Sequence, residues 1–239
     1  MNKIQKKEYT ITINGPSSSG KSSAGLEVAK SLGFSFLSTG NVYRSYAWAL
    51  QCHNISNFAQ KKCIDIMEQY NFEYVGKDVY YNGKNIAGEI GYEELALKAA
   101  MLARKKWYRN WLNQNVIFPY IKNKSIVIEG RGLKEIVTNP SVDFFLKSTI
   151  FARCMRRMGQ FKKKYGIVDS NIDTLYKQIQ KRDFLDINRK IAPLKKEKGT
   201  KVINNTTCKR VDTVKKMLFV IHKRYPELAI DWKIPGSLK

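Results

Sequence analysis

The sequence predicts an α/β fold in which a parallel sheet lies between two layers of helices. Strand-like runs alternate with helical patterns along the chain, which is typical of this class. The runs Ile126–Ile128 and Val142–Leu146 are short and apolar, as expected for strands covered on both faces. A glycine- and serine-rich turn joins the first strand to the first helix. We therefore expect a three-layer α/β/α core.

The first elements carry the clearest local signals. The β-branched residues of Tyr9–Asn14 alternate and predict a strand, and a helical pattern runs from Lys21 to about Ser31. A short apolar strand is predicted at Phe34–Leu37. After it, Ser38-Thr39-Gly40 is expected to begin a second helix.

The remaining elements continue the alternation. Small strands are expected between about residues 73 and 90, with Asn82-Gly83 as a hairpin turn. A long helical pattern then covers Glu93 to Ile117. Helices are expected after each of the two apolar runs, and the last elements are a strand at Lys201–Asn204 and a helix from about Thr213 to His222.

Two segments between core elements are too long for simple crossovers. These segments, at about 40–120 and 153–190, indicate inserted subdomains. We expect one unit over residues 1–239. Its parts are a core at about 9–40, 121–150 and 199–224, an insert at about 41–120, a lid with its following helix at about 151–198, and a C-terminal tail at 226–239.

The net charge is the unusual number in the composition. The chain has 239 residues, of which 43 are Lys or Arg and 20 are Asp or Glu, giving a net charge of +23. A charge of this size suggests a polyanionic ligand, and phosphate-rich small molecules, nucleic acid or a genomic composition bias would each produce it. Hydrophobic residues form 43% of the chain, which excludes wholesale disorder.

Other classes of protein are excluded by what the sequence lacks. No apolar run reaches the roughly 18 residues that span a bilayer, and the first residues lack the apolar stretch of a secretory signal. We expect a cytoplasmic protein with no membrane partner. The four cysteines show no CxxC spacing, so neither a disulfide framework nor a zinc site is indicated.

One motif carries chemistry directly. Gly15-Pro-Ser-Ser-Ser-Gly20-Lys21-Ser22 matches GxxxxGK[ST] at every fixed position and lies between a predicted strand and a predicted helix. Backbone N–H groups of such a loop surround phosphates, Lys21 supplies a point charge, and Ser22 offers a hydroxyl to Mg²⁺. The residues expected to bind a nucleotide's phosphates are Gly15, Ser17, Ser18, Ser19, Gly20, Lys21, Ser22 and Ser23.

The motif alone leaves GTPase, ATPase and kinase open. The chain has no NKxD-type guanine reader, and its two histidines, His53 and His222, lie far from any motif. The scarcity of side chains that could act as a general base is consistent with phosphoryl transfer to another phosphate. A nucleoside monophosphate has a second pKa near ~6 and is already a dianionic nucleophile at neutral pH, so it needs no such base.

Four segments in order carry a family resemblance: ITINGPSSSGKSS, GFSFLSTGNVYR, VIEGRG and KRDFLDINRKIAPL. With them the chain resembles the bacterial cytidylate kinases of the nucleoside monophosphate kinase family, from about Thr10 to Tyr225. The resemblance implies ATP-dependent phosphorylation of CMP and dCMP, with Mg²⁺ as cofactor. It also implies that the insert binds the monophosphate and that a mobile helical lid closes over ATP.

The resemblance assigns roles to individual residues. Arg44, Arg131 and Arg189 match arginines that hold the acceptor and transferring phosphates, and Arg182 and Asp186 match residues that meet the pentose. Arg153, Arg156 and Arg157 match lid arginines that close over the ATP phosphates. The expected catalytic residues are Lys21, Arg131, Arg153, Arg157 and Arg189, and the expected substrate-binding residues are Thr39, Arg44, Arg109, Glu129, Arg131, Arg182, Asp186 and Arg189.

Helical spacing supports part of this assignment. Arg182, Asp186 and Arg189 fall at i, i+4 and i+7, so one helix face would present them to the same cleft. The alternative is a solvated ladder of salt bridges, worth about 0.3–0.5 kcal/mol per pair.

The chain departs from the family pattern where the base is read. Gly132 stands where the family has an Asp that accepts from the exocyclic amine of cytosine, Ala100 replaces a Ser, and Ser38 stands in place of an Asp. Glu129 ends a strand where the family has Asp. We therefore expect weak base discrimination or another acceptor base, and we expect Gly132→Asp to sharpen the preference for cytosine.

A different class of function remains open from the residues alone. The basic, aromatic stretch Arg104–Trp111 and the high charge suggest a nucleic-acid-binding protein that keeps the phosphate loop without turnover. Trp107 and Trp111 are four residues apart on a predicted helix, however, which favours packing over base stacking. We expect a monomer whose partners are ATP and a nucleoside monophosphate.

Overall fold

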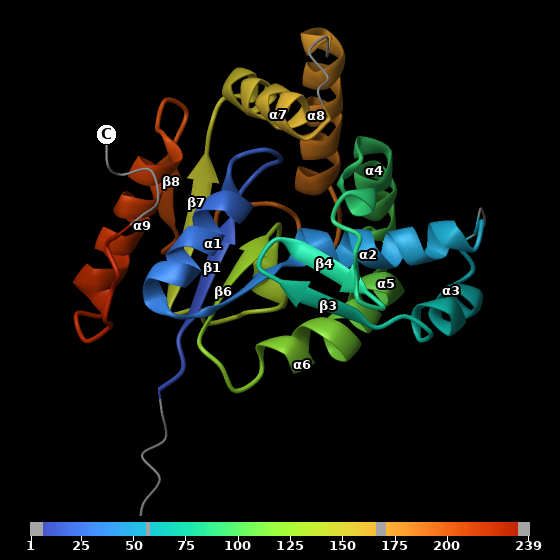
Figure 1. Ribbon diagram of the computed structural model, residues 1–239, viewed down its shortest axis with the longest axis horizontal. Helices are drawn as coiled ribbons and strands as arrows, with labels where there is room; N and C mark the ends of the chain where they lie inside the picture. Colours follow the sequence, from blue (N-terminus) through green and yellow to red (C-terminus); the bar gives the residue numbers. More distant parts are fainter. Residues whose placement is uncertain (1–6, 56–57, 166–170, 234–239) are drawn as a thin grey trace, which may run out of the picture.

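A five-stranded parallel sheet forms the centre of the protein (Figure 1). The structure is a computed structural model, and it describes residues 7–55, 58–165 and 171–233. The strand order is β2-β6-β1-β7-β8, and every neighbouring pair is parallel. The strands are β1 (Thr10–Asn14), β2 (Ser35–Ser38), β6 (Ile126–Gly130), β7 (Val142–Lys147) and β8 (Lys201–Asn204). The predicted α/β fold with a parallel sheet is confirmed.

Helices flank the sheet, and a small antiparallel sheet lies in the insert. The helices are α1 (Lys21–Leu32), α2 (Thr39–Cys52), α3 (Gln60–Met67), α4 (Glu93–Leu102), α5 (Lys106–Leu112), α6 (Phe118–Ile121), α7 (Ile150–Tyr165), α8 (Ile172–Ile187) and α9 (Arg210–Arg224). The small sheet contains β3 (Phe72–Val75), β4 (Asp78–Tyr81) and β5 (Lys84–Asn85). Asn82 and Gly83, at φ 49° and 75°, form the predicted hairpin turn between β4 and β5.

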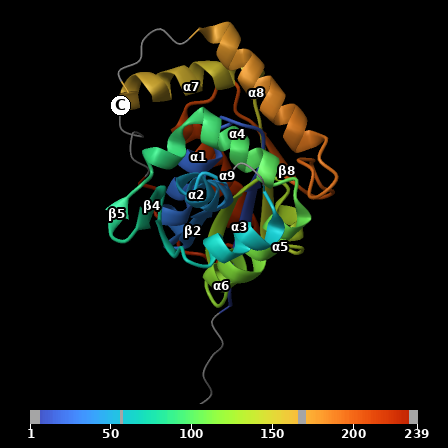
Figure 2. The same cartoon turned by 90° about the vertical axis from the view of Figure 1, so that its right-hand side faces the viewer.

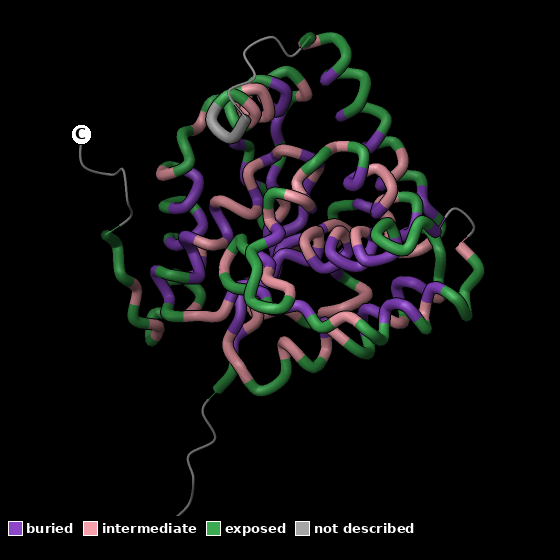
Figure 3. Tube along the Cα trace, turned by 45° about the vertical axis from the view of Figure 1, so that its right-hand side comes forward, coloured by how far each residue is buried: buried purple, intermediate pink, exposed green. Residues whose placement is uncertain are grey.

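Two apolar clusters hold the layers together. One cluster packs α1 and α9 against one face of the sheet, through side chains such as Val28, Ile13 and Met217. The other cluster joins β2 and β6 to α2, α5 and the small sheet. Buried positions run through the centre of the molecule, and exposed positions lie on the outer turns of the helices (Figure 3).

Strand β7 differs from the expected doubly covered strand. Its residues alternate between buried and half-buried or exposed, because Asp143 and Phe145 point away from the α1–α9 layer. The Asp143 carboxylate accepts hydrogen bonds from the Thr12 hydroxyl (2.6 Å), the Asn14 amide (3.1 Å) and the Thr200 hydroxyl. Contrary to the prediction, Val142–Leu146 is therefore not a continuous apolar run, because a polar network around Asp143 covers its second face.

The single helix predicted over Glu93–Ile117 is also wrong. Helix α4 ends at Leu102, Lys105 is extended (φ −82°, ψ 120°), and α5 begins at Lys106. The break allows Tyr108 to turn inward, where it is fully buried and its hydroxyl donates to the Tyr43 carbonyl (2.8 Å). A π-helical segment, Asn113–Ile117, then continues α5.

The segment after β6 has less helix than expected. Only one 3₁₀ turn, Leu133–Glu135, lies between β6 and β7 in this part of the chain. After β7 the expected helices are present, and α7 and α8 form an arch over α4 (Figure 2).

The described part of the predicted tail packs onto the core. The Asp231 amide donates to the Ser31 carbonyl (2.8 Å), and Leu228 and Ile230 contact the cluster between α1 and α9. The Tyr9 hydroxyl donates to Glu227 (2.7 Å). Residues 234–239 of this predicted tail lie outside the described residues.

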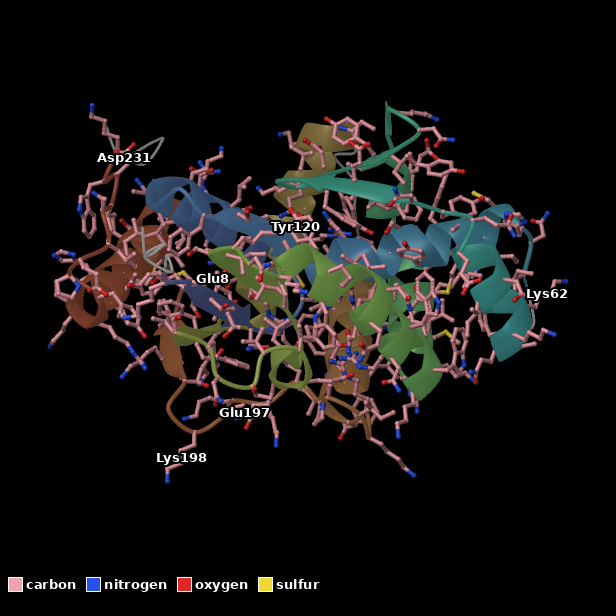
Figure 4. All side chains as sticks on the ribbon, turned by 90° about the horizontal axis from the view of Figure 1, so that it is seen from below. Glu8, Lys62, Tyr120, Glu197, Lys198 and Asp231 are labelled. Carbon is pink, nitrogen blue, oxygen red and sulfur yellow. The ribbon has the colours of Figure 1, made fainter. Side chains whose placement is uncertain are left out.

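Surface lysines are spread around the molecule. In Figure 4 the exposed side chains of Lys62 and Lys198 project outward from separate parts of the fold. Among the described helices, none has both the length and the apolar character needed to cross a membrane. The four cysteines are free; Cys63 and Cys154 are buried, Cys208 is half-buried and Cys52 is exposed.

Candidate active site

One cleft gathers nearly all of the predicted site residues. It lies at the carboxyl ends of β1, β2 and β6, where the phosphate loop (residues 15–22), α2, α4, α7 and α8 meet. The predicted residues that line it are Ser17, Ser18, Ser19, Gly20, Lys21, Ser22, Ser23, Thr39, Arg44, Arg109, Glu129, Arg131, Arg157, Arg182, Asp186 and Arg189. Gly15 and Arg153 are absent from the wall of this cleft.

Lys21 lies at the floor of the cleft. Its ammonium donates to the Pro16 carbonyl (2.7 Å) and lies 3.4 Å from the Ser19 hydroxyl. Burial and then the charge of Arg131 lower the pKa of Lys21 to about 7. A bound phosphate would restore the charged ammonium, so the loop is built to receive an anion.

Glu129 joins the phosphate loop to β2. Its carboxylate oxygen Oε1 accepts from the hydroxyls of Ser22 (2.7 Å) and Ser38 (2.5 Å). The Thr39 hydroxyl donates to the Glu129 carbonyl (3.0 Å). Ser22 and Glu129 thus place a hydroxyl and a carboxylate together beside the loop, and these are the oxygen ligands that Mg²⁺ prefers.

Three arginines and one aspartate form the centre of the cleft. Asp186 pairs with Arg131 (Nε–Oδ2, 2.9 Å) and with Arg189 (Nη1–Oδ1, 3.3 Å), and Arg189 also donates to the Arg131 carbonyl (2.7 Å). Burial lowers the pKa of both Arg182 and Arg189 to about 10. Cations held close together at such a depth favour a polyanionic ligand.

Arg189 reaches this centre by a different route from the one predicted. Helix α8 ends at Ile187, so Arg189 does not lie on the same helical face as Arg182 and Asp186. Its guanidinium instead folds back because Nε donates to the Ala192 carbonyl (2.7 Å). The single-face prediction is wrong, although the three side chains do line one cleft.

Arg44 adds a further, half-buried cation from α2. Its pKa is lowered to about 9, first by burial and then by the neighbouring charge of Arg182. Its guanidinium also donates to the Asn41 side chain.

Glu93 connects the insert to the two helices of the arch. Its carboxylate pairs with Arg157 of α7 (2.6 Å) and Arg182 of α8 (3.3 Å). Although burial opposes ionisation, these arginines lower the pKa of Glu93. Glu93 therefore bridges α4, α7 and α8 at the mouth of the cleft.

The prediction that Arg153 and Arg156 face the ATP phosphates is not met by the geometry. Arg153 is buried behind the phosphate loop, where it pairs with Asp183 (2.5 Å) and donates to the Ser17 carbonyl (3.0 Å). Arg156 donates to the carbonyls of Asn205 and Thr206. Of the three predicted lid arginines, Arg157 alone lines the cleft. The lysines Lys162, Lys163 and Lys164 extend the same basic patch in the sequence; Lys162 is exposed, and the side chains of the other two lie outside the described residues.

The opposite end of the cleft is apolar with one cation. Helix α4 contributes three wall positions to it, Ala96, Ala99 and Ala100, and Ala103 directly after the helix contributes a fourth. Arg109 lies beside them, 2% exposed, and its Nε donates to Glu135 (2.8 Å). Glu135 also accepts from the Asn113 amide (3.0 Å). The Glu135 carboxylate thus lies near this end of the cleft, but its oxygens accept hydrogen bonds from Arg109 and Asn113.

The structure has no room for an aspartate side chain at position 132. Its φ is +67°, and an added Cβ would lie 2.1 Å from the Ala192 carbonyl oxygen and 2.9 Å from Arg189 Nη2. A larger residue would therefore displace Arg189 rather than reach the base. The expectation that Gly132→Asp sharpens base preference is incompatible with this packing.

The basic, aromatic stretch Arg104–Trp111 is mainly a packing element. Trp107 and Trp111 are half-buried against the insert cluster, and the Trp111 ring meets Tyr46 edge to face at 5.2 Å. This arrangement agrees with packing, the interpretation that their spacing favoured.

Four functional candidates were missed by sequence reasoning: Asp183, Glu93, Glu135 and Asn205. Each contacts a partner that is distant in sequence, so helical or strand periodicity gives no signal for it. Asp183 alone lies inside a recognised segment, next to Arg182.

Comparison with known proteins agrees with this architecture. The cytidylate kinase family model matches residues 11–223. The cytidylate kinase of Fervidobacterium nodosum is 33% identical over 216 residues, covering 90% of this chain and 96% of the relative. Those of Ureaplasma urealyticum and Mycoplasma pneumoniae are 33% and 32% identical, covering 80% and 78% of this chain and 85% and 84% of theirs. Because the family model spans most of the sequence and these relatives align over nearly their whole length, the chain belongs to the cytidylate kinase family.

Proposed function

We propose that the protein transfers the γ-phosphoryl group of ATP to CMP or dCMP, giving the diphosphate. The observation that carries the proposal is one cleft in which the phosphate loop faces a second group of buried arginines. Two nucleotides would bring several negative charges together, and buried guanidinium groups stabilise such charge better than water does. The names of the relatives support the cytidine acceptor.

The donor end of the cleft is the phosphate loop. In this proposal Gly15 shapes the loop, the N–H groups of residues 17–23 surround the ATP phosphates, and Lys21 contacts the transferred group. Arg157, at the mouth, reaches the donor phosphates when Glu93 releases it. Arg153 acts from behind the loop and does not touch substrate.

The acceptor end is formed by Arg44, Arg131 and Arg189. The monophosphate is already a dianion near neutral pH, so no protein base is required, and the arginines hold it in line with the γ-phosphorus. Asp186 orients two of these guanidinium groups through its two oxygens. Arg182 and Asp186 are the proposed contacts of the pentose.

Ser22 and Glu129 fit a magnesium ion. Among the described residues no three acidic, His or Cys side chains gather into a metal site, so the protein would supply few direct ligands. The bound ion would neutralise charge on the donor phosphates and leave phosphate and water oxygens in its other positions. Ser22 would bind it directly, and Glu129 would bind it or hold its water.

The remaining roles concern the base and the moving parts. Thr39 and Arg109 are proposed to contact the acceptor nucleoside, with Glu135 fixing Arg109. We further propose that the insert at about 41–120 binds the acceptor and that residues 151–198 act as the lid. We also propose that the protein acts as a monomer.

A phosphorylation screen tests the proposal. ATP and Mg²⁺ are incubated with CMP, dCMP, UMP, AMP and dTMP, and the diphosphate formed is measured. The names of the relatives favour a cytidine acceptor over the relaxed or different acceptor base that Gly132 and Ala100 suggested, so we now expect CMP and dCMP to be preferred. We expect Lys21→Ala to lose activity by at least about a hundredfold. If every acceptor fails with protein that still binds MgATP, the proposed reaction is wrong.

A further inference from the structure

The phosphate loop contains one residue in an unfavourable backbone conformation. Ser18 has φ 55°, in the left-handed region that residues with a Cβ rarely adopt. Such a conformation persists only where the surrounding structure enforces it, and it is concentrated at functional sites. The contacts of its two neighbours show what enforces it.

Ser17 is held through both of its backbone polar groups. Its N–H donates to Asp183 Oδ1 (3.0 Å), and its carbonyl accepts from Arg153 Nη1 (3.0 Å). The same Arg153 nitrogen pairs with Asp183 Oδ2 (2.5 Å). All three residues are buried, with exposed fractions of 7% or less, and the two charged side chains come from α8 and α7.

Ser19 is held by a residue that follows the edge strand β8. Its carbonyl accepts from the Asn205 side-chain amide (2.8 Å), and Asn205 follows β8. Asn205 is fixed in turn, because its own N–H donates to the Lys147 carbonyl (2.9 Å) and its carbonyl accepts from Arg156. Ser18 therefore lies between two residues whose backbone groups are held in place by side chains from distant segments.

We propose that Asp183, Arg153 and Asn205 are positioning residues that force Ser18 into its left-handed conformation and thereby aim the N–H groups of the loop at the ATP phosphates. This inference rests on the proposed function only in naming ATP as the ligand. None of the three side chains lines the cleft, so each acts through the loop. Loss of one contact lets the loop relax to an ordinary conformation, and ATP must then restore the strained one on binding.

A double-mutant cycle with Ser18→Gly tests the inference, because glycine adopts the left-handed conformation at little cost. The dissociation constant of MgATP is measured by calorimetry without any acceptor. We expect Asp183→Asn to weaken MgATP binding about tenfold when Ser18 is retained. In the Ser18→Gly background we expect the same change to weaken it less than about threefold. Ile66→Val on α3, a buried change remote from the loop, should leave binding unchanged.

Asp183→Asn leaves the buried Arg153 without its counter-charge, and the variant can fail to fold. Two other variants then replace it in the cycle, each made with and without Ser18→Gly. One is Asn205→Ala, and the other combines Arg153→Met with Asp183→Asn. Equal weakening with and without the Ser18→Gly change would overturn the inference, because a general loss of structure is not rescued by glycine. Failure of the proposed function is distinguishable, because the wild-type protein would then bind MgATP without phosphorylating any acceptor.

Discussion

Replacing Gly132 by alanine should have two consequences at once: it should destabilise the folded protein, and it should displace Arg189 from the acceptor end of the cleft. The left-handed conformation at φ +67° costs an L-residue about 1–2 kcal/mol. The new Cβ would also lie 2.1 Å from the Ala192 carbonyl oxygen and 2.9 Å from Arg189 Nη2, distances that force the 189–192 segment outward. Because that carbonyl accepts from Arg189 Nε, the displacement moves the guanidinium as well.

The two effects add to about 2–4 kcal/mol, with overpacking contributing about 1–2 kcal/mol of it. Gly33 provides a matched control, since its φ is +64° and an added Cβ meets no atom within 4 Å. Gly33→Ala should therefore cost only the conformational part, about 1–2 kcal/mol.

Urea unfolding and steady-state kinetics measure the two effects. Gly132→Ala should lower the free energy of unfolding more than Gly33→Ala, and only Gly132→Ala should reduce kcat with CMP, by about tenfold or more. If the two variants lose equal stability and both keep full activity, Gly132 is not crowded by the 189–192 segment and the reasoning fails.

Three further outcomes follow from the cleft. Lys21 has a pKa of about 7 in the folded protein against its ordinary 10.5, so the unfolded chain binds more protons between these two pH values. From pH 7 to 8.5 the unfolding free energy of the wild type should therefore rise by about 1–2 kcal/mol relative to that of Lys21→Met. Urea titrations that show no such difference would contradict the lowered pKa of Lys21. Glu135→Gln should raise the KM for CMP about fivefold or more and leave the KM for ATP unchanged, because the substitution releases only Arg109. Equal changes in both constants would argue against the proposal that Glu135 positions Arg109 for the acceptor. Glu93→Gln should weaken the contact of α4 with α7 and α8 and lower the unfolding free energy by about 1–3 kcal/mol. Thermal and urea unfolding both measure this change, and an unchanged unfolding free energy would show that the ion pairs of Glu93 do not stabilise the fold.

The parts of the site predicted from sequence are those fixed by local spacing. The phosphate loop is identified by a short motif between a strand and a helix, and Lys21 and Ser22 lie where that motif requires. Arg44 and Arg131 could be assigned only through resemblance, since nothing local distinguishes either one from a surface cation. The structure shows that both arginines line the cleft, which distinguishes them from surface cations.

The errors arise where contacts distant in sequence decide the outcome. Arg153 and Arg157 lie one turn apart on α7, yet one contacts the back of the loop and the other lines the cleft, and helical spacing does not separate these depths. The break before α5 depends on burying Tyr108 beneath α2, which no local propensity records. The prediction for strand β7 is wrong because the network around Asp143 draws its donors from other segments of the chain.

The contact between Asn205 and Ser19 spans 186 residues of chain. During synthesis the motif emerges well before the side chain that secures Ser19, because that side chain follows 186 residues later. Contacts of such separation form late, because a long loop must close first. A nascent polypeptide that stops short of β8 has therefore made every residue of its motif but lacks the means to hold it in working shape.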